Sequence, residues 1–406
     1  MRVQTLLNQI LNLPGLWVKG VRLEGGALII STRRRFKLLT CPCCGTQVRG
    51  RFSEKQRRWR HLAIWGMVTF LEGPIRRLRC PKCQAVLTEL VPWARHDSDF
   101  TRTFEDVVGF LAQQLNATAV AEMTGISWVT VGNIARRLVD ELLEPSRLDG
   151  LRRIGVDEIS FQRHHKYITV VIDHDTQKVV WAAKGKSSET LKGFFDELGP
   201  ERLKALEIVS MDLSAAYQKA VREALPQADI VFDRFHVGRL AQEALDEVRR
   251  AQMRELPKQD HQPLKRSRWP LLKRSDNAKT KDEAKLSEIQ KFNRPLYRGY
   301  LLKESFMEIL DAPSKECAEA EIKSWLSWAS RSRLTPFVKL ARTVRKHLDG
   351  ILRFVDSKLT NARLEGMNNK IRLLSHRAFG FHSAESLIAT IYLCCSGISF
   401  PKQQLV

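Results

Sequence analysis

The sequence predicts a multidomain α/β protein, in which a mixed sheet with helical layers and a helical insertion is preceded by two small modules. Three observations lead to this fold class. Two Cys-x-x-Cys pairs lie among the first hundred residues, a helical segment with a glycine turn follows, and short apolar runs then alternate with helical patterns. A chain of 406 residues with 43% hydrophobic content is long enough for several buried cores.

The chain is strongly basic. Its formal net charge is +22, and residues 1–100 carry 18 Lys and Arg against 6 Asp and Glu. This balance favours a polyanionic partner, most commonly nucleic acid, because Lys and Arg displace counterions from phosphates. A membrane surface is the alternative, but the sequence has no basic amphipathic helix, apolar signal core or run of ~20 apolar residues. We therefore expect a cytoplasmic protein with no membrane partner.

The first module, residues 1–100, carries four cysteines in metal-ligand spacing. Cys41 and Cys44 form one knuckle, and Cys80 and Cys83 form another. Two such knuckles complete a tetrahedral site for Zn²⁺, and this zinc is structural because four thiolates leave no open position for chemistry. An intramolecular disulfide is the alternative, which a reducing cytoplasm disfavours.

Arginines crowd the segment between the two knuckles. Arg57, Arg58 and Arg60 surround Trp59, and Trp65 follows a few residues later. The arginines are either a solvated face or a surface that contacts DNA phosphates, with Trp59 or Trp65 available for packing or stacking.

The sequence pattern of residues 101–148 predicts a helix-turn-helix. Apolar residues from Phe104 onward follow helical spacing, Gly125 marks a turn, and Ser127 is a suitable N-cap for a second helix. Such a second helix is presented to the DNA major groove, although a hairpin of helices in a core has the same pattern. The candidate DNA contacts are Ser127, Thr130, Asn133, Arg136 and Arg137.

The sequence pattern of residues 149–240 predicts the first part of an α/β domain. Three strands in a meander are followed by alternating helices and strands, which is the order of a ribonuclease H-like fold. The strands are expected at 152–162, 166–173, 178–183, 207–211 and 229–232. Asp157 lies on the first strand and Asp212 just after the fourth, so the two carboxylates are neighbours if these strands pair.

A third acid, Glu365, lies in the last segment, residues 351–406. Asn361, Glu365, Asn368 and Arg372 share one face of a predicted helix, where a carboxylate flanked by amides and a guanidinium suits a metal and a phosphate together. A solvated face is the alternative. The intervening residues 241–350 are helical and charged, and they predict an insertion into the α/β domain.

With these motifs, the chain resembles a DDE transposase of bacterial insertion sequences, and most closely the ISL-three (ISL3) family. The resemblance covers essentially the whole chain, in order. It implies that Asp157, Asp212 and Glu365 are a catalytic triad that holds two Mg²⁺ (or Mn²⁺) ions. It gives Asp233 and His236, which match an Asp-x-x-His pattern, an auxiliary role in positioning DNA or a neighbouring acid; we add Asn361 and Arg372 as auxiliary residues.

The resemblance further implies a function. The enzyme would bind double-stranded DNA at terminal inverted repeats, cleave it and transfer the freed strand to target DNA, as a homodimer or larger assembly at the bacterial nucleoid. Two alternatives remain open from the sequence. One is a catalytically inactive DNA-binding regulator, and the other is a structure-selective ribonuclease H-like nuclease.

Overall fold

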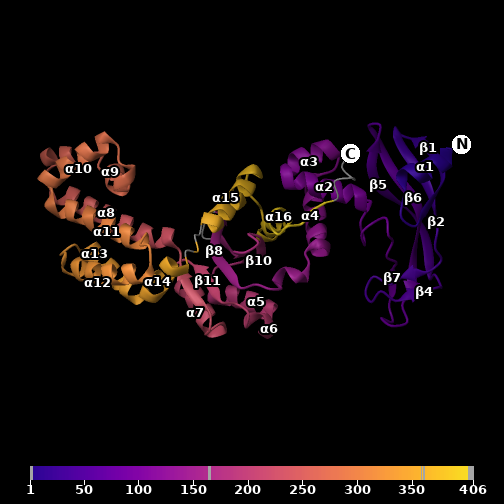
Figure 1. Cartoon of the computed structure of the whole chain (residues 1–406). Coiled ribbons are helices and arrows are strands. Elements are labelled where there is room, and N and C mark those ends of the chain that lie inside the picture. The colour runs from indigo at the N-terminus through magenta and orange to yellow at the C-terminus, as the bar shows by residue number, and fades with distance from the viewer. Residues whose placement is uncertain (1–2, 163–165, 358, 360–361, 401–406) are drawn as a thin grey trace. The chain divides into compact units, whose positions relative to one another are not determined.

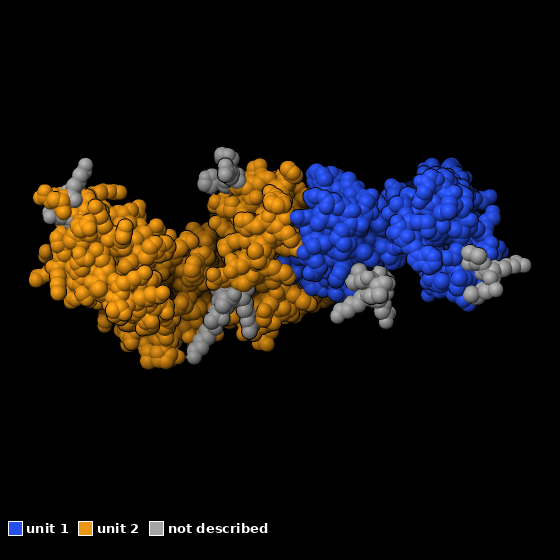
Figure 2. Space-filling model, turned by 90° about the horizontal axis from the view of Figure 1, so that it is seen from above, with its two compact units in different colours: residues 1–143, 392–406 blue, residues 144–391 orange. Residues whose placement is uncertain are grey.

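The computed structural model describes residues 3–162, 166–357, 359 and 362–400. They form two compact units, residues 1–143 with 392–406, and residues 144–391 (Figure 2). The segment from residue 392, which the sequence grouped with the third acid, belongs to the first unit. It is held there because Gln113 Nε2 donates to the carbonyl oxygens of Leu393 and Ile398 at 2.7 and 2.9 Å.

The first unit begins with a five-stranded sheet (Figure 1). Its order is β1-β2-β6-β5, with β7 also pairing β6, and only the β2–β6 pairing is parallel. Trp59 and Trp93 meet edge to face in its core, 5.5 Å apart. The elements are α1 (Val3–Leu11), β1 (Leu16–Glu24), β2 (Ala27–Arg34), β3 (Leu39–Thr40), β4 (Gln47–Val48), β5 (Ser53–Ile64), β6 (Met67–Arg79) and β7 (Val86–Thr88).

Three helices complete this unit: α2 (Arg102–Gln114), α3 (Ala117–Thr124) and α4 (Trp128–Leu142). Each begins at a side-chain cap, namely Thr101, Asn116 and Ser127. Gly125 ends α3 with a φ of +66°, a left-handed conformation that suits glycine. The predicted turn at Gly125 and the predicted N-cap at Ser127 are both confirmed.

The second unit contains the predicted mixed sheet. Its order is β10-β9-β8-β11-β12, in which the first three strands form an antiparallel meander and β11 pairs β8 and β12 in parallel. The pairing of the first and fourth strands is therefore confirmed. The elements are η1 (Pro145–Leu148), β8 (Arg153–Gln162), β9 (Lys166–Asp173), β10 (Val179–Lys184), α5 (Ser188–Leu198), α6 (Pro200–Leu203), β11 (Ile208–Met211), α7 (Ala215–Ala224) and β12 (Asp229–Phe232).

Helices dominate the rest of this unit. Phe306, Trp325 and Phe337 are fully buried where the long helices pack. The elements are α8 (Arg234–Glu255), η2 (Lys258–Leu264), α9 (Arg268–Leu272), η3 (Ser275–Asn277), α10 (Thr280–Phe292), α11 (Arg294–Leu310), α12 (Lys315–Arg331), α13 (Thr335–Lys346), α14 (Leu348–Ser357), α15 (Ala362–Arg377) and α16 (Ala384–Cys395), the last of which crosses into the first unit. None of the described helices combines the length and apolarity that crossing a membrane requires.

Candidate functional site

Two acids meet at one edge of the second sheet. Asp157 lies on β8, and Asp212 follows the last residue of the neighbouring β11. Asp157 Oδ1 accepts from the backbone N–H of Glu158 at 2.7 Å, and Asp212 Oδ1 accepts from that of Ser214 at 2.9 Å. Burial raises the pKa of Asp157 above its ordinary value, and the nearby charge of Asp212 adds to this effect.

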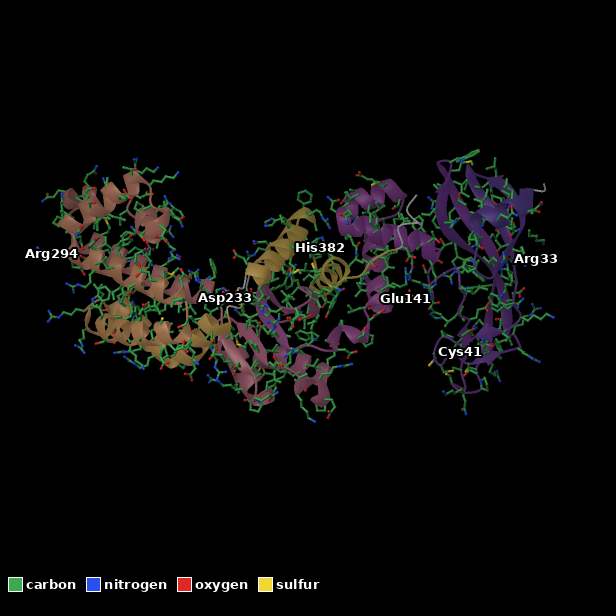
Figure 3. The ribbon with its side chains drawn as sticks, viewed as in Figure 1. Arg33, Cys41, Glu141, Asp233, Arg294 and His382 are labelled. Carbon is green, nitrogen blue, oxygen red and sulfur yellow. The ribbon has the colours of Figure 1, made fainter. Side chains whose placement is uncertain are left out.

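Helix α8 begins next to β11, at Asp233, which Figure 3 labels, and its first turn carries a histidine. Asp233 is the N-cap of α8: its N–H donates to the carbonyl oxygen at the end of β11 at 3.0 Å, and its carboxylate accepts from Phe235 N–H at 2.9 Å. His236 Nδ1 lies 3.1 Å from the Asp233 carboxylate. This contact raises the pKa of His236, and the charges of Asp157 and Asp212 raise it further. An imidazole whose protonated form is favoured therefore accompanies the two acids.

Helix α15 reaches the same edge from a distant part of the chain. The side-chain N–H of Asn368 donates to Asp157 Oδ2. Leu364 packs on β8 at Gly155, where any Cβ would overlap the leucine side chain. Glu365, the next residue, is exposed in the first turn of α15. The structure thus brings the helix of the third acid to Asp157, through Asn368 rather than through Glu365.

Two other predicted residues of this segment are Arg372 and Asn361. Arg372 is exposed and donates to Asn369 Oδ1 at 3.1 Å. Asn361 lies outside the described residues. Sequence reasoning placed Asn368 on the same face as Glu365 but did not include it among the site residues. The signal that could have identified it is its position one helical turn beyond Glu365.

We call the edge that carries Asp157 and Asp212 the acid edge. Its oxygen atoms are of the kind that bind a hard cation. Asn368 Oδ1 is buried without a hydrogen-bond partner in the described chain, beside the carboxylate of Asp157. Carboxylate and amide oxygens are ligands of Mg²⁺ and similar ions. Glu365 does not form a cluster with the two aspartates: of the described His, Cys, Asp and Glu side chains, only the four cysteines form a group of three or more whose ligand atoms all lie within 4.8 Å of one another.

The cysteine cluster itself is compact. Cys41 and Cys83 have sulfurs 3.9 Å apart, and those of Cys44 and Cys80 are 3.5 Å apart. A tetrahedral zinc with Zn–S bonds of about 2.3 Å requires sulfurs about 3.8 Å apart. The hydroxyl of Thr46, 3.1 Å from Cys44 Sγ, helps to lower the pKa of that thiol to about 6. The cluster therefore suits a structural Zn²⁺.

The arginines of the first module are already engaged within the chain. Arg57 pairs with Asp99 at 2.7 Å, and Arg58 pairs with Glu72 at 2.9 Å. Arg60 is partly buried over the rings of aromatic residues from β6 and α2. These guanidiniums stabilise the sheet and its junction with the helices, so a phosphate contact would compete with existing ion pairs.

The predicted DNA contacts on and before α4 differ in their exposure. Ser127, Asn133 and Arg136 are exposed, and Thr130 is half-buried with its hydroxyl 2.8 Å from Ser127 Oγ. The structure also exposes Trp128 and Val129 beside them, at 55% and 49%. Sequence reasoning missed this apolar pair, because an apolar residue in a helix is normally assigned to the core.

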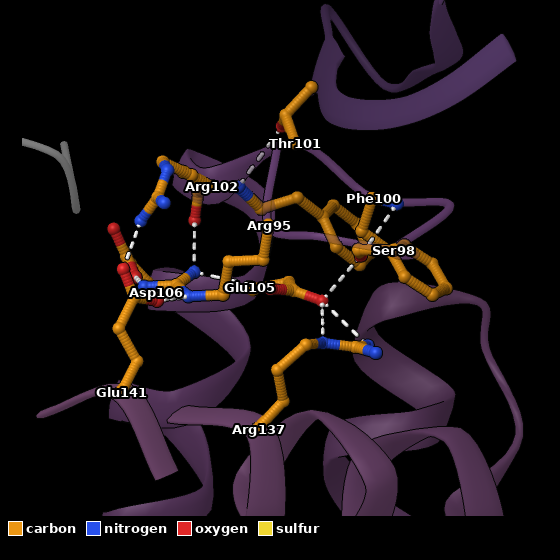
Figure 4. A network of polar contacts seen from close by, with 10 residues as sticks. Arg95, Ser98, Phe100, Thr101, Arg102, Glu105, Asp106, Arg137 and Glu141 are labelled. Atoms are coloured by element: carbon orange, nitrogen blue, oxygen red, sulfur yellow. Dashed lines mark hydrogen bonds and ion pairs between the residues drawn. The ribbon is translucent and has the colours of Figure 1, made fainter. Parts of the chain in front are cut away.

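Arg137, another predicted DNA contact, is engaged within the chain. Its guanidinium lies 2.8 Å from the fully buried carboxylate of Glu105 (Figure 4). Glu105 also binds Arg95, at 3.2 Å, and Ser98, at 2.6 Å. A buried carboxylate needs such partners, so Arg137 holds α4 against α2 while part of its side chain stays exposed.

Comparisons with known proteins cover both units. Residues 154–391 match a family model described as a transposase, residues 89–139 match the helix-turn-helix domain of transposase family ISL3, and residues 37–83 match the zinc-finger of transposases IS204, IS1001, IS1096 and IS1165. The transposase for insertion sequence element IS1557 of Mycobacterium tuberculosis is 38% identical over 92% of this chain and 90% of its own length. The transposase for IS1001 of Bordetella parapertussis is 30% identical over 89% and 90%.

Proposed function

The chain belongs to the ISL3 family of transposases, and on that basis we propose that it cuts DNA at the ends of an insertion sequence and joins the freed ends to target DNA. The observation that carries this proposal is the meeting of Asp157, Asp212 and His236 at one sheet edge with an amide from α15. Paired strand-end carboxylates beside an imidazole suit chemistry on a phosphodiester. The strand order further supports a ribonuclease H-like domain.

We assign the catalytic metal site to Asp157, Asp212 and Glu365. Two Mg²⁺ or Mn²⁺ ions bound there would activate the attacking water or hydroxyl and stabilise the leaving oxygen. Asn368 holds the Asp157 carboxylate in place through its side-chain N–H. Asp233 fixes the start of α8, which keeps His236 beside the acids. Glu365 lies on the same helix and needs to turn toward this edge when the ions bind.

Recognition of the DNA ends is assigned to the first unit. The exposed residues at the start of α4, including Ser127, Asn133 and Arg136, are placed on a helix of the kind that enters the major groove. Thr130 lies among them. The zinc site supports the fold of this unit and takes no part in the reaction. Because a transposition reaction needs two ends, we expect a homodimer or larger assembly on double-stranded DNA at the nucleoid.

The test is cleavage of a duplex that carries the inverted repeats flanking the gene, with Mg²⁺ or Mn²⁺. Wild-type protein should nick the repeat end and join it to a second duplex. Asp157→Asn should bind the same duplex with unchanged affinity and do neither, since it keeps the shape of the side chain but loses the charge.

Other outcomes identify other functions. Cleavage by Asp157→Asn would contradict the site. End binding by wild-type protein with no metal-dependent nicking would indicate a catalytically inactive regulator. Cutting that ignores the repeat sequence and never joins strands would indicate a structure-selective nuclease.

A further inference from the structure

The hairpin of β5 and β6 ends in a strained two-residue turn. Its residues, Trp65 and Gly66, both have positive φ, +51° and +76°, between the paired Ile64 and Met67. Turns with two positive φ values favour Asn or Gly at the first position, because a larger side chain is strained in the left-handed region. The Trp65 side chain is 96% exposed, so burial does not offset this strain.

The same sheet forms an equivalent turn without strain. The β1–β2 hairpin closes through Gly25 and Gly26, with φ of +56° and +79°. The two tips lie at the same end of the sheet, since β2 and β6 pair in parallel from their first residues. Glycine therefore satisfies this geometry in the neighbouring hairpin, and the fold gives no reason for a tryptophan at residue 65.

The strained tip is anchored on the helix-turn-helix. Arg60 N–H donates to the Asp99 carbonyl oxygen at 2.8 Å, and Thr101 N–H donates to the Arg60 carbonyl oxygen at 2.9 Å. Leu62 packs against the core of the three helices. Trp65 follows Leu62 by three residues, or roughly 10 Å of extended strand. The tip thus projects from the same rigid unit that presents α4.

We propose that the β5–β6 tip is a second DNA contact of this unit, in which Trp65 lies against double-stranded DNA next to the segment bound by α4. This inference rests on the proposed function. An indole offers a flat apolar face for sugars and base edges and an N–H donor for groove acceptors. Apolar side chains of DNA-binding proteins pack into the minor groove in this way.

The charge of the module and the position of the tip favour DNA as the partner that the tip contacts. The module that carries it holds 18 Lys and Arg against 6 Asp and Glu. An exposed aromatic ring on so basic a module, fixed to a helix-turn-helix, suits a polyanion better than a second copy of the chain. Local strain that the fold does not require points to a functional role for the residue.

The test uses the full-length protein and a fluorescein-labelled duplex taken from the DNA flanking its gene. Trp65→Gly recreates the turn of β1–β2, and Trp65→Asn supplies the other favoured residue. Both variants should bind the duplex about tenfold more weakly, which corresponds to about 1.4 kcal/mol of lost contact free energy. Both should also unfold at a temperature equal to that of wild type or about 3 °C higher, because the strain is relieved. The opposite signs of the two effects separate a DNA contact from a structural role.

Leu23→Asn is the matched control. Leu23 is 69% exposed near the tip of the other hairpin, on β1 at the sheet edge away from the helices. Its substitution should leave DNA affinity unchanged. The salt dependence of binding should also stay unchanged in the Trp65 variants, since no charge is removed.

Equal DNA affinity for wild type and Trp65→Asn overturns the proposal, as does weaker binding accompanied by a lower unfolding temperature. Wild-type protein that fails to bind the flanking duplex overturns the DNA-binding function and the inference with it. A shift from dimer to monomer by sedimentation, in the absence of DNA and caused by Trp65→Asn alone, assigns the tip to a second copy of the chain instead.

Discussion

The Asn368 side chain connects α15 to the acid edge. Its amide N–H holds Asp157, and its carbonyl oxygen is buried and unpartnered within the described chain. Residues that orient a metal-binding carboxylate typically contribute about 10- to 100-fold to metal affinity or activity. We expect Asn368→Ala to lower DNA cleavage by that factor while DNA binding is unchanged.

Asn369→Ala is the matched control for this measurement, because Asn369 is the exposed neighbour on the same helix and its carboxamide oxygen accepts from Arg372. A cleavage assay over a range of Mn²⁺ concentrations separates the two roles of Asn368. Rescue by high Mn²⁺ indicates weakened metal binding. Unchanged cleavage by Asn368→Ala at every concentration would contradict the assigned role.

Single residues also mark where sequence reasoning succeeds and where it stops. Ser127 as a helix cap follows from its side-chain chemistry and the helical pattern after it, both of which are local. The partner of Arg137 is not local: Glu105 lies 32 positions away and becomes visible only when α2 and α4 pack. The conformation of Trp65 was also not predictable, because nothing in the neighbouring sequence indicates a turn with a left-handed tryptophan after β5.

The packing of α15 on β8 depends on one glycine. Gly155 lies under Leu364, and an added Cβ would also approach His174, which is buried and bonded to Ser210 Oγ at 2.7 Å. We expect Gly155→Ala to push α15 away from the sheet and so to abolish cleavage, with a destabilisation of about 1–3 kcal/mol from overpacking.

The double variant Gly155→Ala with Leu364→Ala tests this account. Removing the leucine side chain makes room for the new methyl group, so the pair should be coupled and recover part of the lost cleavage. Cleavage rates and urea unfolding of the two single variants and the double variant measure the coupling. Strictly additive losses would show that the two positions do not meet.

The junction of β5 with α2 should respond to pH. His61 is buried, and its Nδ1 lies 2.9 Å from Thr101 Oγ1. Burial lowers the pKa of His61 from 6.5 to about 4. Between these values the unfolded chain binds more protons than the folded chain, so stability is lost as pH falls. We expect the first unit to lose about 2 kcal/mol of stability between pH 7 and pH 5 from this residue.

His61→Gln removes the titrating group and keeps a polar side chain at the same place. Urea unfolding followed at pH 7 and pH 5 should show a smaller pH effect in this variant than in wild type. Any loss that remains in the variant belongs to other groups, including the cysteine ligands, which release metal as they are protonated. An identical pH effect in both proteins would contradict the assignment to His61.

Helices and strands were predictable where a short apolar pattern is followed closely by residues that end the element. The five strands of the second sheet follow from short apolar runs, whereas the pairing of the first with the fourth was a condition set by the fold class, which the structure meets. Gly73 and Pro74 interrupt the apolar pattern of β6, yet the structure continues through them in one strand. Gly73 faces the Thr32 side chain at close range there, which favours a residue without Cβ.

The two units have separate cores, and only the first contains the cysteine cluster. The cluster's own core is small, with Leu39 and Leu78 buried beside Cys41 and Cys80. So few apolar residues do not stabilise a fold without metal, whereas a structural zinc contributes on the order of 10 kcal/mol. Removal of zinc by a chelator under reducing conditions should therefore unfold the segments around the cysteines, residues 37–48 and 80–88, and leave the second unit folded.

Hydrogen exchange followed by mass spectrometry measures this outcome directly. Peptides from β3, β4 and β7 should lose protection after chelation, and peptides from β8 to β12 should exchange as slowly as before. Cys43→Ser, at the exposed cysteine outside the cluster, should behave as wild type, whereas Cys41→Ser should resemble the chelated protein without any chelator. If chelation exposed both units together, their stabilities would be coupled. The catalytic unit would then require zinc for its fold, which the separate cores argue against.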